Sequence, residues 1–329
     1  MMAQLPTLLV TFDAEGRLRA LVEQAARDKA QILWLADLSG VARENALRGA
    51  GAVIARHTNE LKQGEPAMLT SARLLQMTTA GVDYIPFGDL PPTLPIAQNA
   101  GPFSEAMAEH AIAMALAAAK RLFIEHRNLA NGAFNQFTRN RMLAGGVCGI
   151  FGMGAVGEAT ARRMRALGLR IHAVNRRGAS AEPVDWIGTP DRLAELLAAS
   201  DVLVIAAALT RATLGAIGAR ELGLMKKDAI LVNLARGEII DEAALYCHLQ
   251  ANPGFTACID SWWVEPLRHG KFRLDHPFLD LPNVIGSPHN SAMVPGVFDD
   301  VLRQAVGNCL RALGGDEPLR LVRPEERMA

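Results

Sequence analysis

The chain has 329 residues, of which 50% are hydrophobic, and its 34 basic residues balance 34 acidic ones. That length is more than one hydrophobic core usually serves, so we expect two domains. The zero formal net charge and the lack of a basic run argue against a nucleic-acid partner. No apolar stretch approaches the roughly 18 residues of a membrane span, so no membrane segment is expected.

The N-terminal sequence and the cysteines predict a cytoplasmic protein. The first residues lack a basic segment before their apolar stretch and reach Asp13 too early for a secretory signal peptide. Cys148, Cys247, Cys258 and Cys309 form no CxxC pair, which argues against a metal site or a disulfide framework. Each lies among apolar neighbours, so we expect four buried thiols in a reducing compartment.

Four continuous apolar stretches in the first hundred residues predict the strands of a small α/β unit. They begin at Leu8, Gln31, Ala52 and Arg73 and read LLVTF, QILWLA, AVIAR and RLLQMTT. Apolar residues that run continuously, instead of alternating, are typical of a parallel sheet covered on both faces. A proline-rich stretch from Pro86 then indicates an exposed connection or a boundary.

A long alanine-rich helix is predicted from Ser104, a suitable N-cap, to about Arg121. Its faces are mostly small and apolar, which is unusual for a solvated helix. We therefore expect it to be buried against another element or another subunit, and we predict a homodimer assembled mainly through the domain that follows.

The rest of the chain alternates strands with helices. The predicted strands read VCGIFG, RIHAVN, VLVIAAA, AILVNLA, FTACIDS and NVIGS. We expect the helices between them to begin at about Ala155, Pro190, Ala219 and Asp241. This repetition predicts a doubly wound parallel sheet. A last helix is expected from about Ser291 to Leu313.

A glycine pattern at the first of these strand-to-helix turns predicts a dinucleotide site. Gly152, Gly154 and Gly157 form a G-x-G-x-x-G motif directly after a strand and before a helix. The glycines permit a tight turn, a close approach to a pyrophosphate and close helix–strand packing, while the helix N-terminus offers N–H groups to the phosphates. The predicted cofactor loop is Gly152, Met153, Gly154, Ala155, Val156 and Gly157.

The end of the next strand predicts which dinucleotide binds. An NAD site has an acidic residue about 20 residues after the motif, where it holds the ribose 2′-hydroxyl. Here, 18 residues after Gly157 (175 − 157), stands Asn175, followed by Arg176 and Arg177. An arginine pairs with a 2′-phosphate that a carboxylate would repel. We therefore expect NADPH to be preferred, with NAD as a possible cofactor.

Three polar segments follow later strands, where open α/β sheets bind ligands. They are 233–237 (NLARG), 260–266 (DSWWVEP) and 287–290 (SPHN). Together with TTAGVDYI before Pro86 and QNAGPFSEAMAEHA around Ser104, in this order, they resemble the D-isomer-specific 2-hydroxyacid dehydrogenase family, and the resemblance covers nearly the whole chain.

The resemblance implies two domains. A Rossmann cofactor domain would occupy residues 99–290, and a smaller flavodoxin-like substrate domain would combine residues 1–98 with 291–329. Substrate and nicotinamide would lie in the cleft between them, and two connecting segments would suit a hinge that closes on the ligand.

The resemblance also implies catalytic roles. Arg236 would bind the substrate carboxylate and polarise its carbonyl, His289 would be the general acid–base, and Glu265 would be its carboxylate partner. The chemistry agrees, since hydride arriving at a ketone leaves an alkoxide that needs a proton, and histidine titrates near neutral pH. A nearby carboxylate favours the imidazolium, and the arginine fork orients a carboxylate.

Other residues have implied or open roles. Thr79, Ala80 and Gly81 resemble a backbone N–H cradle for the substrate carboxylate, and Asp260 resembles a structural or cofactor-adjacent residue. The roles of three aromatic residues stay open at this point: His57, Trp262 and Trp263.

The expected function is reduction of a small 2-oxo acid by NADP(H), with a glyoxylate-like or hydroxypyruvate-like substrate and no metal. Formate dehydrogenases of this resemblance carry glutamine where this chain has Glu265, which argues against formate. Two alternatives stay open. One is an NADP(H)-sensing regulatory protein on the same fold, and the other is a phosphite-type dehydrogenase that uses the same three residue types.

Overall fold

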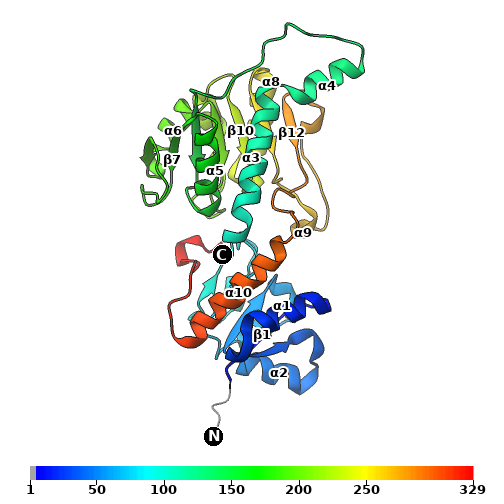
Figure 1. Cartoon of the computed structure of the whole chain (residues 1–329), viewed down its shortest axis with the longest axis vertical. Helices are drawn as coiled ribbons and strands as arrows, with labels where there is room; N and C mark the ends of the chain where they lie inside the picture. The colour runs from blue at the N-terminus through cyan, green and yellow to red at the C-terminus, as the bar shows by residue number, and fades with distance from the viewer. Residues whose placement is uncertain (1–4, 329) are drawn as a thin grey trace. The chain divides into compact units, whose positions relative to one another are not determined.

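The computed structural model describes residues 5–328 of a chain that divides into two compact units (Figure 1). Unit 1 combines Met1–Phe103 with Val294–Ala329, and unit 2 is Ser104–Met293. Each unit is an α/β structure with its own parallel sheet. Among residues 5–328, no helix combines the length and apolar character needed to cross a bilayer.

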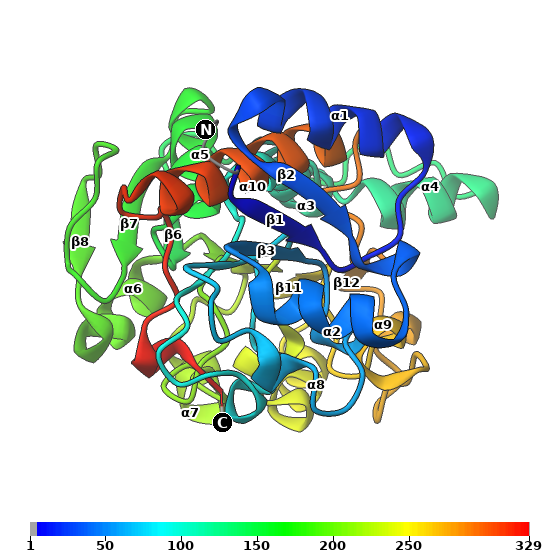
Figure 2. The ribbon, with the colours of Figure 1, turned by 90° about the horizontal axis from the view of Figure 1, so that it is seen from below.

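Unit 1 is built on a five-stranded sheet in the order β2-β1-β3-β4-β5, and every neighbouring pair is parallel. Helices α1 (Gly16–Ala26) and α10 (Val297–Gly314) lie over one face, and α2 (Gly40–Gly49) lies over the other (Figure 2). The strands are β1 (Thr7–Val10), β2 (Gln31–Trp34), β3 (Ala52–Ala55), β4 (Leu75–Met77) and β5 (Ile96–Ala97).

Two apolar layers explain why these strands read as continuous hydrophobic runs. Leu8 of β1 belongs to a buried cluster with Val22 of α1 and Ala305 of α10. Its neighbour Leu9 belongs to a second cluster with Leu47 of α2. Successive side chains of a strand point to opposite faces, so both must be apolar when helices cover both faces.

Unit 2 is built on a seven-stranded parallel sheet in the order β12-β11-β10-β9-β6-β7-β8. The chain starts at β6 and later returns to its other side with β9, so the order reverses there. Such reversal points are where open α/β sheets leave a crevice for ligands. The strands are β6 (Val147–Phe151), β7 (Arg170–Val174), β8 (Trp186–Gly188), β9 (Val202–Ile205), β10 (Ile230–Asn233), β11 (Thr256–Ile259) and β12 (Val284–Gly286).

Helices cover both faces of this sheet (Figure 2). On one face α3 (Ser104–Ala119) packs against α5 (Ala155–Ala166). The other face carries α6 (Leu193–Ala199), α7 (Ala219–Leu224) and α8 (Glu242–Ala251). Two further helices lie in the segments between these elements: α4 (Leu122–Ala130) between α3 and β6, and α9 (Pro266–His269) between β11 and β12.

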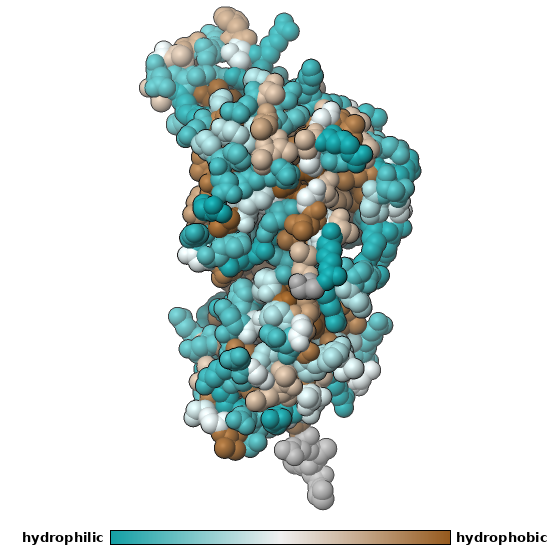
Figure 3. All heavy atoms as spheres, turned by 180° about the vertical axis from the view of Figure 1, so that it is seen from behind, coloured by the Kyte–Doolittle hydropathy of each residue, from teal (hydrophilic) through white to brown (hydrophobic). Residues whose placement is uncertain are grey.

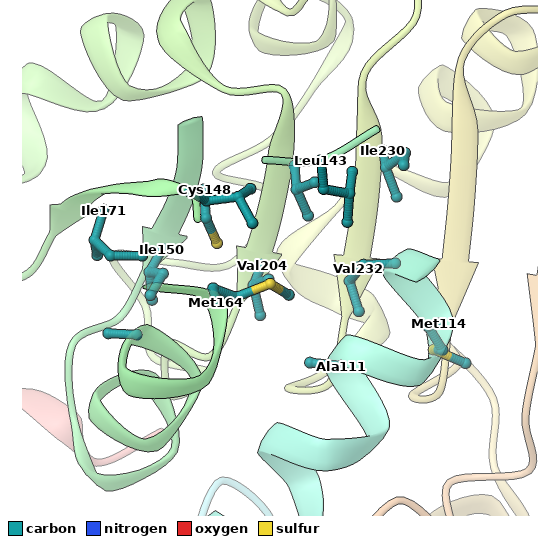
Figure 4. Close-up of a cluster of buried hydrophobic side chains, with 14 of the residues drawn as sticks. Ala111, Met114, Leu143, Cys148, Ile150, Met164, Ile171, Val204, Ile230 and Val232 are labelled. Atoms are coloured by element: carbon teal, nitrogen blue, oxygen red, sulfur yellow. The ribbon is translucent and has the colours of Figure 1, made fainter. Parts of the chain in front are cut away.

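Only one side of α3 is buried inside unit 2, and Ala113 on the helix is exposed. Ala111 and Met114 of α3 pack with Ile150 of β6, Met164 of α5 and Val232 of β10 (Figure 4). The predicted burial of this helix against another element is thus confirmed for that side.

The structure corrects four details of the sequence reading. The last helix begins at Val297, not near Ser291, because Gly296 has φ +82° and ends the preceding turn. The helix expected at Pro190 starts as a 3-10 turn before α6. Strands β5 and β8 are too short to stand out as apolar runs. Cys247 is exposed, whereas Cys148, Cys258 and Cys309 are buried, and all four are free thiols.

Candidate active site

Three polar loops leave neighbouring strands of unit 2 at the same edge of the sheet. Arg236 follows β10, Glu265 follows β11 and His289 follows β12, and these strands are adjacent in the order β12-β11-β10. The carboxyl ends of parallel strands share one edge, so strand pairing brings together segments that are far apart in sequence.

Glu265 and His289 form a hydrogen-bonded pair. His289 Nδ1 lies 2.7 Å from Glu265 Oε2, and the other carboxylate oxygen accepts a bond of 2.7 Å from the backbone N–H of Trp262. An ionised carboxylate only accepts, so Nδ1 carries the hydrogen, and Nε2 is the nitrogen left for a ligand. Glu265 is 6% exposed, whereas His289 is exposed. The carboxylate of the pair is therefore buried, and its imidazole is accessible to a ligand.

The environment keeps the Glu265 carboxyl ionised. Burial alone would raise the pKa of this carboxyl. The bond and charge of His289, the Trp262 N–H and the charge of Arg236 act in the opposite direction, and the pKa ends below its ordinary value. The ionised carboxylate accepts the Nδ1 hydrogen of His289 and fixes the orientation of the imidazole ring.

The loop that carries Arg236 is fixed by its own backbone. Asn233, which is fully buried, donates from Nδ2 to the carbonyl of Arg236 (2.9 Å) and accepts from the N–H of Ala235 (3.1 Å). A Cβ on Gly237 would lie 2.5 Å from the backbone of Trp262 and Trp263. Only glycine lets the β10 loop approach the β11 loop this closely, which explains the N-x-x-R-G pattern.

The predicted cofactor loop turns sharply between β6 and α5. Gly152 has φ +103°, and a Cβ there would lie 2.3 Å from the backbone of Ala207. A Cβ on Gly157 would meet the carbonyl oxygen of Gly152 at 2.2 Å. A Cβ on Gly154 would meet nothing within 4 Å. The first and third glycines are needed for packing, and the second leaves open space at the N-terminus of α5.

The remaining residues of this loop continue into the helix. Met153 is buried, while Ala155 and Val156 form the first turn of α5, where backbone N–H groups have no helical acceptor. Open space beside such donors fits a pyrophosphate.

The arginine turn follows β7, the strand next to β6. Asn175 closes the turn with both ends of its amide, since Nδ2 donates to the carbonyl of Ala179 (2.7 Å) and Oδ1 accepts from the N–H of Arg177 (3.0 Å). Arg176 and Arg177 are exposed. Asn175 thus has a structural task in addition to lacking a negative charge.

In unit 1, the loop 79–81 follows β4. Thr79 is held by its hydroxyl, which bonds the carbonyl of Gly81 at 2.9 Å and the hydroxyl of Tyr84 at 2.6 Å. Within residues 5–328, no hydrogen bond uses the backbone N–H of Ala80 or Gly81. These two N–H groups are therefore available to an anionic ligand.

Residues 112–291, more than half of the chain, match the family described as D-isomer specific 2-hydroxyacid dehydrogenase, NAD binding domain. The chain belongs to this family. The family is one of 2-hydroxyacid dehydrogenases and reductases, and the matched range contains the glycine loop, the arginine turn and the three polar loops.

Individual relatives agree with this assignment. The chain is 31% identical over 262 residues to D-3-phosphoglycerate dehydrogenase of Archaeoglobus fulgidus, covering 77% of this chain and 48%, about half, of that protein. It is 26% identical over 323 residues to glyoxylate reductase/hydroxypyruvate reductase of Mus musculus, covering 95% of this chain and 97% of the relative.

A solved structure shares the fold. The D-isomer specific 2-hydroxyacid dehydrogenase from Xanthobacter autotrophicus, crystallised with NADPH and MES, gives a TM-score of 0.82 at 23% identity, over 98% of this chain and 99% of that chain. At that identity the likeness shows the two-domain α/β fold alone.

The structure gives packing partners to the aromatic residues whose roles were open. Both tryptophans of this family member are buried, and their indole N–H groups donate to backbone carbonyls, Trp262 to Ser287 (2.8 Å) and Trp263 to Ile240 (2.7 Å). In unit 1, the ring of His57 packs against Tyr84 with centroids 4.8 Å apart and the ring planes 48° apart, and burial lowers the pKa of His57.

Asp260 and two residues that sequence reasoning did not single out lie beneath the β12 loop. The Asp260 carboxylate is fully buried and accepts the hydroxyl of Ser287 at 2.5 Å. His110 of α3 contacts the same hydroxyl at 3.0 Å. No spacing signal connects His110 with Ser287, because they are 177 positions apart and belong to different elements.

Proposed function

We propose that this family member reduces the carbonyl of a small 2-oxo acid with NADPH, giving the D-2-hydroxy acid. The observation that supports this most directly is the Glu265–His289 pair, in which a buried carboxylate holds Nδ1 and leaves Nε2 free to give a proton. The substrate class is glyoxylate-like or hydroxypyruvate-like, as the name of the mouse relative suggests.

Each side chain has a separate task in this proposal. His289 protonates the carbonyl oxygen from Nε2 as the carbonyl carbon is reduced, and Glu265 stabilises the imidazolium before the transfer. Arg236 holds the substrate carboxylate through two parallel N–H donors and draws electron density from the adjacent carbonyl. In unit 1, the N–H groups of Ala80 and Gly81 are proposed as further donors to a substrate carboxylate.

The cofactor has a matching set of residues in unit 2. Bound NADPH supplies the hydride. The open space beside Gly154 and the first N–H groups of α5 would hold its pyrophosphate. Arg176 and Arg177 are exposed at the end of β7 and would hold its 2′-phosphate. We accordingly propose unit 2 as the dinucleotide-binding domain and unit 1 as the substrate domain.

A substrate panel tests the proposal. NADPH oxidation is measured with glyoxylate, hydroxypyruvate, pyruvate, phenylpyruvate and 2-oxoisocaproate, and we expect turnover with the smaller acids. NADP⁺ reduction by phosphite, without turnover of any oxo acid, would favour a phosphite-type dehydrogenase. Tight NADPH binding without turnover of any compound would favour a regulatory protein.

We also propose a homodimer, formed through an apolar arm of unit 2. The arm, residues 122–142, comprises α4 and the following loop, and it projects from the sheet in Figures 1 and 2. None of the side chains of α4 is buried, and hydrophobic residues stand at the projecting end in Figure 3. The large exposed ones are Leu122, Phe123, Leu129, Phe134, Phe137 and Met142. A second copy could cover this surface with the same surface of its own, because a two-fold interface is self-complementary.

Sedimentation tests the dimer. We expect the wild type to sediment at twice the chain mass of 35.3 kDa, and the double variant Phe134→Ser, Phe137→Ser to dissociate. Leu214→Ser removes an exposed apolar side chain outside the arm and should stay dimeric. A wild-type monomer at micromolar concentration would contradict the proposal.

A further inference from the structure

A polar cluster around a buried carboxylate lies beneath the loop that carries His289. It consists of His110 on α3, Asp260 after β11 and Ser287 after β12, all within unit 2. We propose that His110 is a positioning residue for His289, acting through Ser287 and Asp260. The proposal rests on the function proposed above, because it assigns His110 to the orientation of the proton donor.

The Asp260 carboxylate organises the loop. It is fully buried and accepts the Ser287 hydroxyl at 2.5 Å, the N–H of Asn290 at 3.2 Å and the N–H of Ser291 at 3.3 Å. A buried carboxylate without donors would be strongly destabilised. The donors before and after His289 in the sequence therefore bind the same carboxylate, and these bonds fix the backbone of the loop between them.

The backbone of His289 needs such a fixation. Its φ is +52°, in the left-handed region that residues other than glycine rarely adopt. A conformation of this kind persists where the surroundings determine it more strongly than the residue itself does. Here the hydrogen bonds from Ser287 and Asn290 to Asp260 hold the backbone of His289 in this conformation. Weakening one of them lets the imidazole turn away from Glu265.

Proton accounting gives His110 a defined role. The Ser287 hydroxyl has one hydrogen, and it donates this hydrogen to Oδ1 of Asp260. His110 Nε2, 3.0 Å from the same oxygen, must therefore be the donor to Ser287. His110 Nε2 also lies 3.8 Å from Asp260 Oδ1. Donation into the hydroxyl polarises it and strengthens its bond to the carboxylate.

Ser287 connects this cluster to the catalytic pair. Its N–H donates to the carbonyl of Ile259 (2.9 Å), and its carbonyl accepts the indole N–H of Trp262 (2.8 Å). The backbone N–H of Trp262 in turn donates to Glu265. The supports of Glu265 and of His289 thus meet at Ser287, and α3 contributes to both through His110.

Two substitutions of His110 test the proposal. His110→Phe keeps the ring volume and removes the donor, whereas His110→Gln keeps an N–H donor near the position of Nε2. We expect His110→Phe to lower kcat for oxo-acid reduction about tenfold to a hundredfold, as small misplacements of catalytic groups do. The KM and the NADPH Kd should stay within about twofold, and His110→Gln should recover most of kcat.

Controls separate positioning from general damage. His172→Phe replaces another half-buried histidine of unit 2, one whose ring packs against Trp186, and should leave kcat unchanged. Ser287→Ala should lose a similar amount of kcat to His110→Phe, and the double variant should lose little more, because both break one chain of bonds. An unchanged kcat in His110→Phe, or equal losses in His110→Phe and His110→Gln with a lowered Tm, would overturn the proposal.

A spectroscopic measurement keeps this inference separable from the proposed function. Imidazole ¹⁵N spectra of the full chain, with the His289 signals assigned from His289→Ala, report the hydrogen bond from Nδ1 to Glu265. We expect these signals to move in His110→Phe and to stay in place in His172→Phe. If the wild type turns over no oxo acid and the signals still move, the function fails and the positioning stands. If they do not move, the positioning is wrong whatever the activity.

Discussion

Two regions at the same edge of the unit 2 sheet are built in opposite ways. The loops after β10, β11 and β12 have buried polar groups, such as Asn233 and Asp260, whose hydrogen bonds come from the chain itself. The turn after β7 exposes Arg176 and Arg177 to solvent, and Asn175 closes it. In the first region, where a proton would be transferred, internal hydrogen bonds fix the positions of the loops. In the second region, where the cofactor phosphate would bind, the charged side chains are exposed. Substitutions should therefore have large effects in the first region and small ones in the second.

The largest effect is expected for His289→Ala. The variant removes the proposed proton donor, so kcat for oxo-acid reduction should fall about 10²–10⁴-fold, the usual contribution of general acid catalysis. The NADPH Kd should stay unchanged, because the glycine loop and the arginine turn are untouched. Steady-state kinetics and cofactor fluorescence measure the two quantities. A loss of less than about fivefold would remove His289 from the mechanism.

Arg236→Lys tests whether geometry, and not charge alone, governs the first region. Lysine keeps the positive charge but loses the planar fork that binds a carboxylate at two points. We expect kcat/KM for the oxo acid to fall about tenfold to a hundredfold with little change in cofactor binding. The buried amide of Asn233 still holds the loop, so Tm should stay close to that of the wild type. A lysine variant within about twofold of the wild type would mean that Arg236 does not clamp the substrate.

Glu265→Gln should change the pH dependence more than the maximal rate. The Glu265 carboxyl is ionised because its pKa lies below the ordinary value, and reduction needs a protonated imidazole beside it. Glutamine retains a hydrogen-bond acceptor but has no charge, so the rate should begin to fall at lower pH than in the wild type. At neutral pH the loss should be about tenfold. A profile that does not move would show that Glu265 is not the electrostatic partner of His289.

The pattern of apolar residues made the strands predictable, whereas contacts between distant segments were not. Strands such as β1 and β6 stand out because helices cover both of their faces, so that nearly every position is apolar. The sequence motifs also predicted that the segments 233–237, 260–266 and 287–290 follow strands and carry the polar residues of the site. Sequence could not show that Glu265 and His289 are 2.7 Å apart, because that depends on β11 and β12 being neighbours.

Local conformation was the other limit of sequence reading. The left-handed backbone of His289 lies between residues that bond Asp260, and a histidine at that position does not indicate such a backbone from sequence. The sequence shows that Asn175 lacks a charge but not that its amide closes the turn. Both features depend on hydrogen bonds that form only in the folded chain.

The smallest effect is expected in the second region, for Arg176→Ala. The wild type should prefer NADPH over NADH by about tenfold, since a charge-assisted bond to the 2′-phosphate contributes to affinity but this turn is exposed and screened by solvent. Arg176→Ala should weaken NADPH binding and leave NADH binding nearly unchanged.

The matched control and the salt dependence decide whether this preference comes from the arginine turn. Arg220→Ala removes another exposed charge, from α7, where it pairs with Glu221, and should alter the binding of neither cofactor. The preference for NADPH should shrink as ionic strength rises, because exposed charges are screened over about 10 Å at 0.1 M salt.

Asn175→Asp should weaken NADPH binding by repulsion of the 2′-phosphate. It also removes the donor to the carbonyl of Ala179 and loosens the turn, so the gain in NADH binding should be small. Equal kcat/KM for both cofactors in the wild type at low salt would show that the turn has no part in recognition. In that case the arginine turn would differ from the loops after β10, β11 and β12 in its structure but would have no role in cofactor recognition.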